Sequence, residues 1–233
     1  MAKFAIITCE DKVFQGDKIQ FDFTKSVITP DETPAVISHE FSADGLSYVN
    51  ITPTKMIDWV FLVPGAQTIY FRHTSNVGSQ ISTKSITILD LAAQKLFSTD
   101  TDLVAYEPEI IKWLPKKWSS WNIIHLRAQD YILNLLREKR ILDVKGNSYT
   151  KDDIFDRSEV RDLSAALVLR YIFSGTSNSS DDVFQKKSDE YDELVSTREA
   201  AMSIKLDFNK NGLKDESSDS VTETFHSIEM KRG

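Results

Sequence analysis

The sequence is poor in the features that mark disulfide scaffolds, exported proteins and membrane proteins. Its 233 residues include one cysteine, Cys9, so neither an intramolecular disulfide nor a cysteine cluster for zinc can form. No run approaches the ~20 apolar residues that span a bilayer. The first residues, MAKFAIITCEDK, lack the long apolar core of a signal peptide. We therefore expect a protein made in the cytoplasm, with no membrane partner.

Positive charge is also scarce. The chain has 28 Lys and Arg against 35 Asp and Glu, a net charge of -7, whereas binding to phosphate needs a basic surface. One local exception is Lys116 and Lys117 beside Trp113, Trp118 and Trp121. This pattern is typical of a site for single-stranded nucleic acid, where aromatic rings stack on bases and lysines bind phosphates. The alternative, which we prefer, is a short loop whose tryptophans pack against helix ends while its lysines are solvated.

Motifs for catalysis are missing as well. The four histidines, His39, His73, His125 and His226, are scattered, and none has the spacing of a metal-ligand motif. There is no phosphate-binding loop, no GxGxxG and no GxSxG. Cys9 has no histidine near it in sequence, so a small core thiol is a better interpretation than a nucleophile. We predict no catalytic residue, no enzymatic activity and no cofactor.

Residues 1–90 are predicted to form β-structure. Ile19, Phe21 and Phe23 alternate with polar residues, which indicates a strand with one buried face. We predict a two-domain α+β chain whose first domain is an antiparallel β-sandwich. The predicted strands are FAIITC (4–9), KIQFDFT (18–24), AVISHEF (35–41), SYVNIT (47–52), WVFLV (59–63), TIYFRHT (68–74) and SITIL (85–89).

Part of this half resembles a known family. The segment 59–89, WVFLVPGAQTIYFRHTSNVGSQISTKSITIL, is similar to the second half of an immunoglobulin-like domain of the PKD or bacterial Ig-like kind. There, a strand leads through a Pro-Gly turn to alternating aromatics, then to a glycine-containing turn and a last strand. The resemblance implies a spacer or a binding domain without catalysis.

The chain changes character after residue 90. We predict a connecting segment with short helices over 91–118, a helical bundle over 119–206 and a polar tail over 207–233. The second bundle helix, 158–174, is apolar on most sides, which is typical of a central helix. The first helix is predicted to be capped by Ser119 or Ser120, with an apolar stripe of Trp121, Ile124, Ala128, Tyr131, Leu135 and Leu142.

Acidic residues indicate where the later helices begin. Thr150 and Asp153 have the spacing of a capping box that opens a short turn. Asp181 and Asp182 fall in the first turn of a third helix, about 180–204, where negative charge favours the helix dipole. The predicted apolar stripe of that helix is Phe184, Tyr191, Val195 and Met202.

The helical half resembles the head-tail connector proteins of tailed bacteriophages, of the adaptor type. Similarity runs through 102–141 and 162–219. Its order is an acidic YEP lead-in, a helix ending in basic residues, an apolar helix ending in a Ser/Asn turn, a long charged helix, and a strand-like IKLDF before an acidic tail broken by glycine.

The resemblance implies a structural protein of the virion neck. Members of this family form homo-oligomeric rings, commonly dodecamers, between the portal protein and the next neck or tail protein, and DNA crosses the ring only as cargo. The residues expected to carry assembly lie in the second and third bundle helices. They are Leu163, Leu167, Tyr171, Phe184 and Tyr191.

One motif in the tail suggests a different function. Asp207, Asn209, Asn211 and Asp215 surround Gly212 with the spacing of a calcium loop, but the twelfth position is Ser218 rather than glutamate. The preferred interpretation is therefore an Asx-rich turn that leaves the bundle. The alternative function is a surface adhesion or binding module stabilised by calcium, with the Ig-like domain as its recognition domain.

Overall fold

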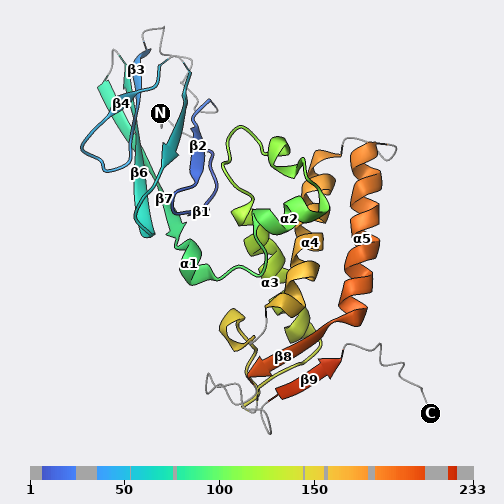
Figure 1. Cartoon of the computed structure of the whole chain (residues 1–233). Helices are drawn as coiled ribbons and strands as arrows, with labels where there is room; N and C mark the ends of the chain where they lie inside the picture. The colour runs from blue at the N-terminus through green and yellow to red at the C-terminus, as the bar shows by residue number, and fades with distance from the viewer. Residues whose placement is uncertain are drawn as a thin grey trace, which may run out of the picture. The chain divides into compact units, whose positions relative to one another are not determined.

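The computed structural model describes residues 7–24, 36–52, 54–75, 78–143, 145–154, 157–177, 182–207 and 220–224 (Figure 1). It contains both α-helices and β-strands, as predicted for an α+β chain. The chain divides into two compact units. The first comprises 1–94 with 114–120, and the second comprises 95–113 with 121–233. The chain therefore passes between the units three times, whereas the sequence suggested one junction over 91–118.

The described part of the first unit contains two sheets. One has five strands in the order β1-β7-β6-β3-β4, and the other pairs β2 with β5. Among the described strands of this unit, β1 pairs with β7 in parallel and the other pairings are antiparallel. The expectation of a purely antiparallel arrangement is thus wrong. The strands are β1 (Lys12–Phe14), β2 (Lys18–Asp22), β3 (Val36–Ser42), β4 (Val49–Asn50), β5 (Met56–Val60), β6 (Gly65–Ser75) and β7 (Gly78–Leu89).

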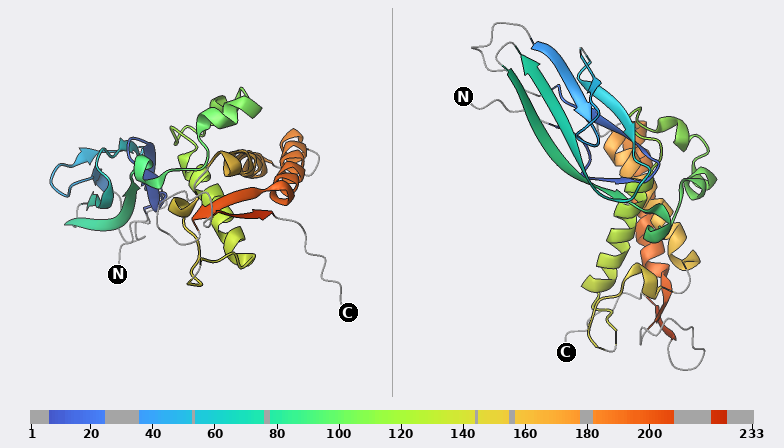
Figure 2. Two further views of the ribbon diagram at one scale, coloured as in Figure 1. Left: turned by 60° about the horizontal axis from the view of Figure 1, so that its bottom comes forward. Right: turned by 90° about the vertical axis from the view of Figure 1, so that its left-hand side faces the viewer.

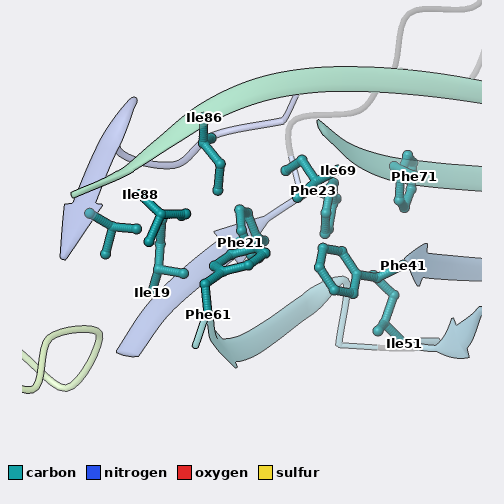
Figure 3. Close-up of a cluster of buried hydrophobic side chains, with 11 residues drawn as sticks. Ile19, Phe21, Phe23, Phe41, Ile51, Phe61, Ile69, Phe71, Ile86 and Ile88 are labelled. Atoms are coloured by element: carbon teal, nitrogen blue, oxygen red, sulfur yellow. The ribbon is translucent and has the colours of Figure 1, made fainter. Parts of the chain in front are cut away.

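Side chains from both sheets meet in one buried apolar cluster (Figure 3). The predicted alternation is confirmed, because Ile19, Phe21 and Phe23 are all buried. The ring of Phe23 stacks on Phe71 of β6 at 4.3 Å, and Phe21 stacks on Phe41 of β3 at 5.0 Å. These aromatic pairs join the two sheets and add to the stabilisation that burial provides.

Several predicted strands differ in extent. WVFLV (59–63) is replaced by β5, because the chain turns after Val60. SYVNIT yields only the two residues of β4, while SITIL lies at the end of the much longer β7. Of FAIITC, the described part contributes a single bridge between Thr8 and Asp22.

The second unit is built around α4 (Ser158–Thr176), which packs against α2 (Asp100–Tyr106), α3 (Asn122–Glu138), α5 (Val183–Ala201) and β8 (Ser203–Asp207). Figures 1 and 2 show α3, α4 and α5 running side by side. This position explains why α4 is apolar on most sides, and it confirms the predicted central helix. No described helix is long and apolar enough to cross a membrane.

The start and the buried face of α3 differ from the prediction. Its N-cap residue is Trp121. Ser119 and Ser120 do not cap it, because their hydroxyls donate to Asp17 in the first unit. The helix ends before Leu142, which is bridged to Ser148 instead. The buried face is His125, Ala128, Gln129, Ile132 and Leu136, so most of it is rotated from the predicted stripe.

The predicted capping box of Thr150 and Asp153 is confirmed, whereas Asp182 precedes α5 as its N-cap residue and does not lie in its first turn. The backbone N–H and the hydroxyl of Thr150 both donate to Asp153, at 2.6 and 2.7 Å, and open a 3-10 turn, η2 (Lys151–Asp153). Asp182 caps α5 by accepting a hydrogen bond from the backbone N–H of Phe184. Tyr191, Val195 and Met202 of the predicted α5 stripe are buried.

A second strand follows α5 where a polar tail was expected. β8 pairs antiparallel with β9 (Ser220–Thr224), and Asp207 lies opposite Ser220. The sequence of β9, SVTET, has no apolar alternation, so its pairing with β8 rather than its own pattern makes it a strand. The predicted polar tail therefore contains a strand at 220–224.

Candidate functional site

Within the predicted lysine and tryptophan patch, the ammonium of Lys117 lies 5.4 Å from the ring centre of Trp118. Trp121 is buried in the second unit, where Trp113 packs edge-on against Phe173 at 5.4 Å. Lys116 and Lys117 belong to the first unit. The carbonyl of Lys116 accepts from the ammonium of Lys18, and Lys117 lies 3.9 Å from Glu10. The preferred interpretation, tryptophans packed at helix ends, agrees with these contacts.

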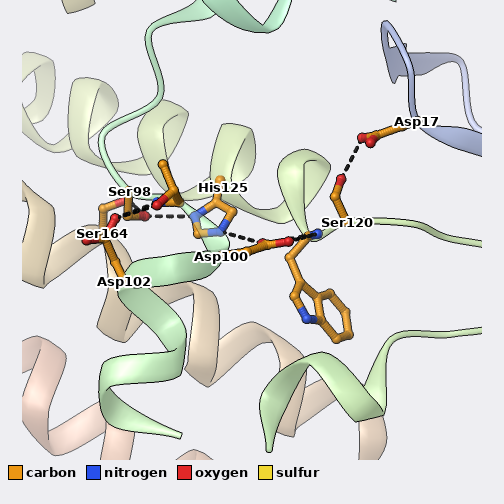
Figure 4. A network of polar contacts seen from close by, with 9 residues as sticks. Asp17, Ser98, Asp100, Asp102, Ser120, His125 and Ser164 are labelled. Carbon is orange, nitrogen blue, oxygen red and sulfur yellow. Dashed lines mark hydrogen bonds and ion pairs between the residues drawn. The ribbon is translucent and has the colours of Figure 1, made fainter. Parts of the chain in front are cut away.

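A buried polar network lies where α2, α3 and α4 meet (Figure 4). The Ser98 hydroxyl contacts His125 Nδ1 at 2.8 Å and the Ser164 hydroxyl at 2.7 Å. His125 Nε2 lies 3.1 Å from Asp100 Oδ1, and the carboxylate of Asp100 also accepts from the backbone N–H of Trp121. These bonds satisfy polar groups that burial would otherwise leave unpaired.

The network begins at a cap that sequence reasoning missed. Thr99 donates to Asp102 through its backbone N–H at 2.8 Å and its hydroxyl at 2.9 Å, forming a capping box for α2. The spacing T-x-x-D is visible in the sequence at 99–102, within the segment predicted only as a connection with short helices. The box fixes the start of α2, and it places Asp100 in the first turn, facing His125.

Ser98 contacts His125, and His125 contacts Asp100, which is the order of contacts in a Ser-His-Asp catalytic triad. The surroundings of these residues, however, differ from those of a catalytic site. Ser98 is 1% exposed, and His125 and Ser164 are 0% exposed. A nucleophile must reach its substrate within hydrogen-bonding distance. Ser98 is also held by two partners at once. The arrangement is suited to tying three helices together, not to attacking a bound molecule.

A second polar contact joins α2 to α5. Glu107 forms an ion pair with Lys187 and accepts a hydrogen bond from the Tyr191 hydroxyl at 3.1 Å. Burial, followed by the charge of Glu107, raises the pKa of Tyr191 above its usual value, so this phenol stays a donor. Phe173 stacks on Tyr191 at 5.6 Å. The contact anchors the outer helix α5 on α2 and α4.

The residues predicted to carry assembly do not form one surface. Leu163 and Leu167 are buried in the core around α4, and Tyr191 is buried against α2 and α4. Tyr171 is half-buried beneath the guanidinium of Arg127, 4.2 Å from the ring centre, and Phe184 is half-buried against Trp113. The exposed apolar residues of the described second unit are Val104, Ile111, Trp113, Leu142 and Val183.

Most of the calcium motif lies outside the described residues, namely Asn209, Asn211 and Asp215. Asp207 is the last residue of β8 and is buried. Within the described part of the chain, no group of three His, Cys, Asp or Glu residues is placed to hold a metal ion.

The sheet of the first unit brings together two histidines that the sequence left apart. His39 of β3 and His73 of β6 are direct cross-strand partners, with their Nδ1 atoms 3.3 Å apart. The signal that could have found them is the register of the two strands, which a single sequence does not reveal. Cys9 packs partly buried against the same core, and burial raises the pKa of its thiol, as expected of a core cysteine.

No protein-family model and no curated protein matches the chain. Among solved structures, it is similar to a chain from a study titled "Structural basis for the promiscuous specificity of the carbohydrate-binding modules from the beta-sandwich super family". The identity is 20% and the TM-score is 0.34; the match covers 39% of this chain and 36% of that chain.

Proposed function

We propose that the chain is a structural subunit of a virion, an adaptor that forms a ring between the portal and the tail and lets DNA pass. The observation that carries the proposal is the order of elements in the second unit. A helix followed by basic residues, α3, precedes an apolar helix, α4, then a long charged helix, α5, and the strand β8. The connector resemblance has the same order.

The first unit is proposed to be an immunoglobulin-like sandwich that decorates the ring. Two observations support this. The strand order β1-β7-β6-β3-β4 lies opposite the pair β2-β5, and the first strand runs parallel to the last. Side chains from both sheets share one core. In the proposed particle, this unit serves for spacing or binding rather than catalysis.

The proposed partners are further copies of this chain, commonly twelve, with the portal protein and the next neck or tail protein. Contacts between copies are assigned to exposed residues of the second unit, because Leu163 and Leu167 are used within one chain. Trp113 and Val183 are candidates. The net charge of -7 suits a channel that does not hold DNA tightly.

The proposal is tested by purifying the full chain with and without the portal protein of the same genome. Electron microscopy and native mass spectrometry should show rings, alone or on the portal. Val183→Asp should weaken ring formation, whereas Leu46→Asp, a matched change at an exposed residue of the first unit, should not. Monomers that fail to bind the portal contradict the proposal. A melting temperature raised by calcium and lowered by EDTA would favour the calcium-stabilised binding module instead.

A further inference from the structure

The end of α3 and the loop that follows it carry an excess of positive charge in an acidic chain. Residues 137–151 contain five lysines and arginines against two acids, Glu138 and Asp143, whereas the whole chain has a net charge of -7. Asp143 is buried, so it adds little to the charge of the surface. Four of the cations are exposed, and together they are called the basic end: Arg137, Lys139, Arg140 and Lys145.

Hydrogen bonds hold the loop of the basic end in place. The carboxylate of Asp143 accepts from the backbone N–H groups of Lys145 at 2.9 Å and of Asn147 at 2.7 Å. Arg137 Nε donates to the Ser148 hydroxyl at 3.3 Å, so the loop returns to the last turn of α3. The helix dipole favours cations in that turn, but it does not account for Lys145, which lies beyond the end of the helix.

A surface of the opposite charge lies on α5. Residues 188–197 contain four acids and no lysine or arginine. Like charges three or four residues apart in a helix repel one another, so this spacing destabilises α5 unless cations lie opposite. Within one copy, Arg170 supplies such a cation, 3.0 Å from Asp192. All four acids are exposed, and together they are called the acidic face: Asp189, Glu190, Asp192 and Glu193.

Both surfaces keep charges that are not neutralised within one copy. Arg140 and Lys145 form no ion pair with a described residue, and the same holds for Glu190 and Glu193. The helix α4 packs against both α3 and α5 and lies between them, so the basic end and the acidic face belong to different sides of the second unit (Figure 1). We propose that the basic end of one copy binds the acidic face of the next copy, head to tail.

Each surface also includes a leucine that a neighbour can cover. Leu142 is 37% exposed and lies between Arg140 and Lys145 in the sequence, and Leu194 is half-buried and follows Glu193. An apolar centre with a charged rim is typical of interfaces, and the complementary charges of the rim select the partner. The charges therefore choose the neighbour, and the leucines add apolar area between the two copies.

This inference rests on the proposed function, because it names the surfaces through which neighbouring subunits of the ring meet. A contact between two different surfaces repeats from copy to copy, and it closes into a ring when the rotation allows. The contact also depends on salt, since exposed charges are screened beyond about 8–10 Å at physiological ionic strength. Association should therefore weaken as sodium chloride is added.

Two charge-reversed variants of the full chain test the contact. The first carries Arg140→Glu with Lys145→Glu, and the second carries Glu190→Lys with Glu193→Lys. Each should weaken association about tenfold or more, alone or on the portal protein, because like charges then face one another. Lys12→Glu with Lys116→Glu is the matched control, since it makes the same change of charge at exposed residues of the first unit and should leave association unchanged. Sedimentation and native mass spectrometry measure all three.

Mixing the two variants tests whether the two surfaces meet. When copies of the two variants alternate, every contact again joins opposite charges, although neither variant can associate with itself. An equimolar mixture should therefore restore association to within about threefold of the wild type, and so should one chain with all four substitutions. A folding defect in either variant would not be repaired by mixing.

The outcomes separate this contact from the proposed function. Rings that form equally well with either pair of substitutions, or that mixing does not restore, overturn the contact and leave the ring standing. Association that mixing restores, without rings or portal binding in electron microscopy, supports the contact and contradicts the ring. A wild type that stays monomeric with and without the portal protein contradicts both. Duplex DNA that binds through Arg140 and Lys145, while association is unchanged in the first variant, assigns the basic end to nucleic acid and overturns the contact.

Discussion

The Nδ1 atoms of His39 and His73 lie 3.3 Å apart on neighbouring strands, at the end of the core of the first unit. His39 is buried, and its ring lies parallel to Phe71 at 5.6 Å. One proton between the two nitrogens forms a hydrogen bond, whereas a proton on each would set two N–H groups against each other and add a positive charge. Burial, with the charges of Lys55 and His73, lowers the pKa of His39 to about 4.

This depressed pKa predicts that the first unit loses stability in acid. Between pH 6.5 and about 4, the unfolded chain binds a proton at His39 that the folded chain does not bind. The free energy of unfolding should therefore fall as the pH is lowered through this window. The loss is at most about 3 kcal/mol, from 1.36 kcal/mol for each unit of pKa. Urea unfolding at pH 7 and pH 4.5 measures it, and NMR titration gives the pKa directly.

The matched variant for this prediction is His39→Gln, which retains hydrogen-bonding capacity without a charge. It should lose most of the dependence on pH in this window, although its stability at pH 7 can be lower. If the variant and the wild type lose equal stability between pH 7 and pH 4.5, or if His39 titrates near 6.5, the histidine pair is not the cause.

A second prediction concerns the segment 114–120, which belongs to the first unit. Asp17 accepts hydrogen bonds from the hydroxyls of Ser119 at 3.2 Å and Ser120 at 2.6 Å, and the backbone N–H of Lys18 donates to Ser119 at 2.8 Å. Asp17→Ala removes both serine contacts, which should cost about 1–3 kcal/mol locally. Trypsin should then cleave faster after Lys116 and Lys117, as mass spectrometry of the fragments can measure.

The control for this experiment is Asp11→Ala, which removes an exposed carboxylate that pairs with Lys84. Cleavage at Lys116 and Lys117 should not change in that variant. Equal rates for the wild type and Asp17→Ala would show that the serine contacts do not hold the segment.

Local patterns in the sequence predicted individual helices and strands better than they predicted which of these elements pair with one another. Alternation identified the inward face of β2, and the spacing of Thr150 and Asp153 identified a cap, because both signals span a few residues. The parallel pairing of β1 escaped detection, since three residues are too few for a period. The polar strand β9 also escaped detection, because it has no apolar alternation and depends on its pairing with β8.

The candidate site was the least predictable part, because it is made of long-range contacts. His39 and His73 are 34 residues apart, and Ser98 is 66 residues from Ser164. Only the register of β3 on β6, and the packing of α2, α3 and α4, bring these groups together. A single sequence contains no signal for either. The prediction of assembly residues meets a related limit, because the apolar pattern of α4 does not distinguish burial within one chain from burial between chains.

A third prediction addresses the network around His125. His125→Leu leaves the Ser98 hydroxyl and the Asp100 carboxylate each without one buried partner, which should lower the free energy of unfolding by about 2–4 kcal/mol. Asn134→Ala, at an exposed position of the same helix, should change it by less than about 0.5 kcal/mol. Chemical denaturation followed by circular dichroism measures both. A loss for His125→Leu as small as that of Asn134→Ala would refute a structural role for the network.

The last prediction compares two glycines with similar backbones and different surroundings. Gly45 has φ +75° and Gly16 has φ +82°, so alanine at either position should cost about 1 kcal/mol for the left-handed conformation. A Cβ at Gly45 would also lie 3.0 Å from two ring carbons of Tyr70, whereas a Cβ at Gly16 meets nothing within 4 Å. Gly45→Ala should therefore lower the free energy of unfolding by about 1–3 kcal/mol more than Gly16→Ala. Equal losses in urea unfolding would mean that the Tyr70 ring moves aside without cost. In that case, the loop before β4 would be packed less firmly than its contacts indicate.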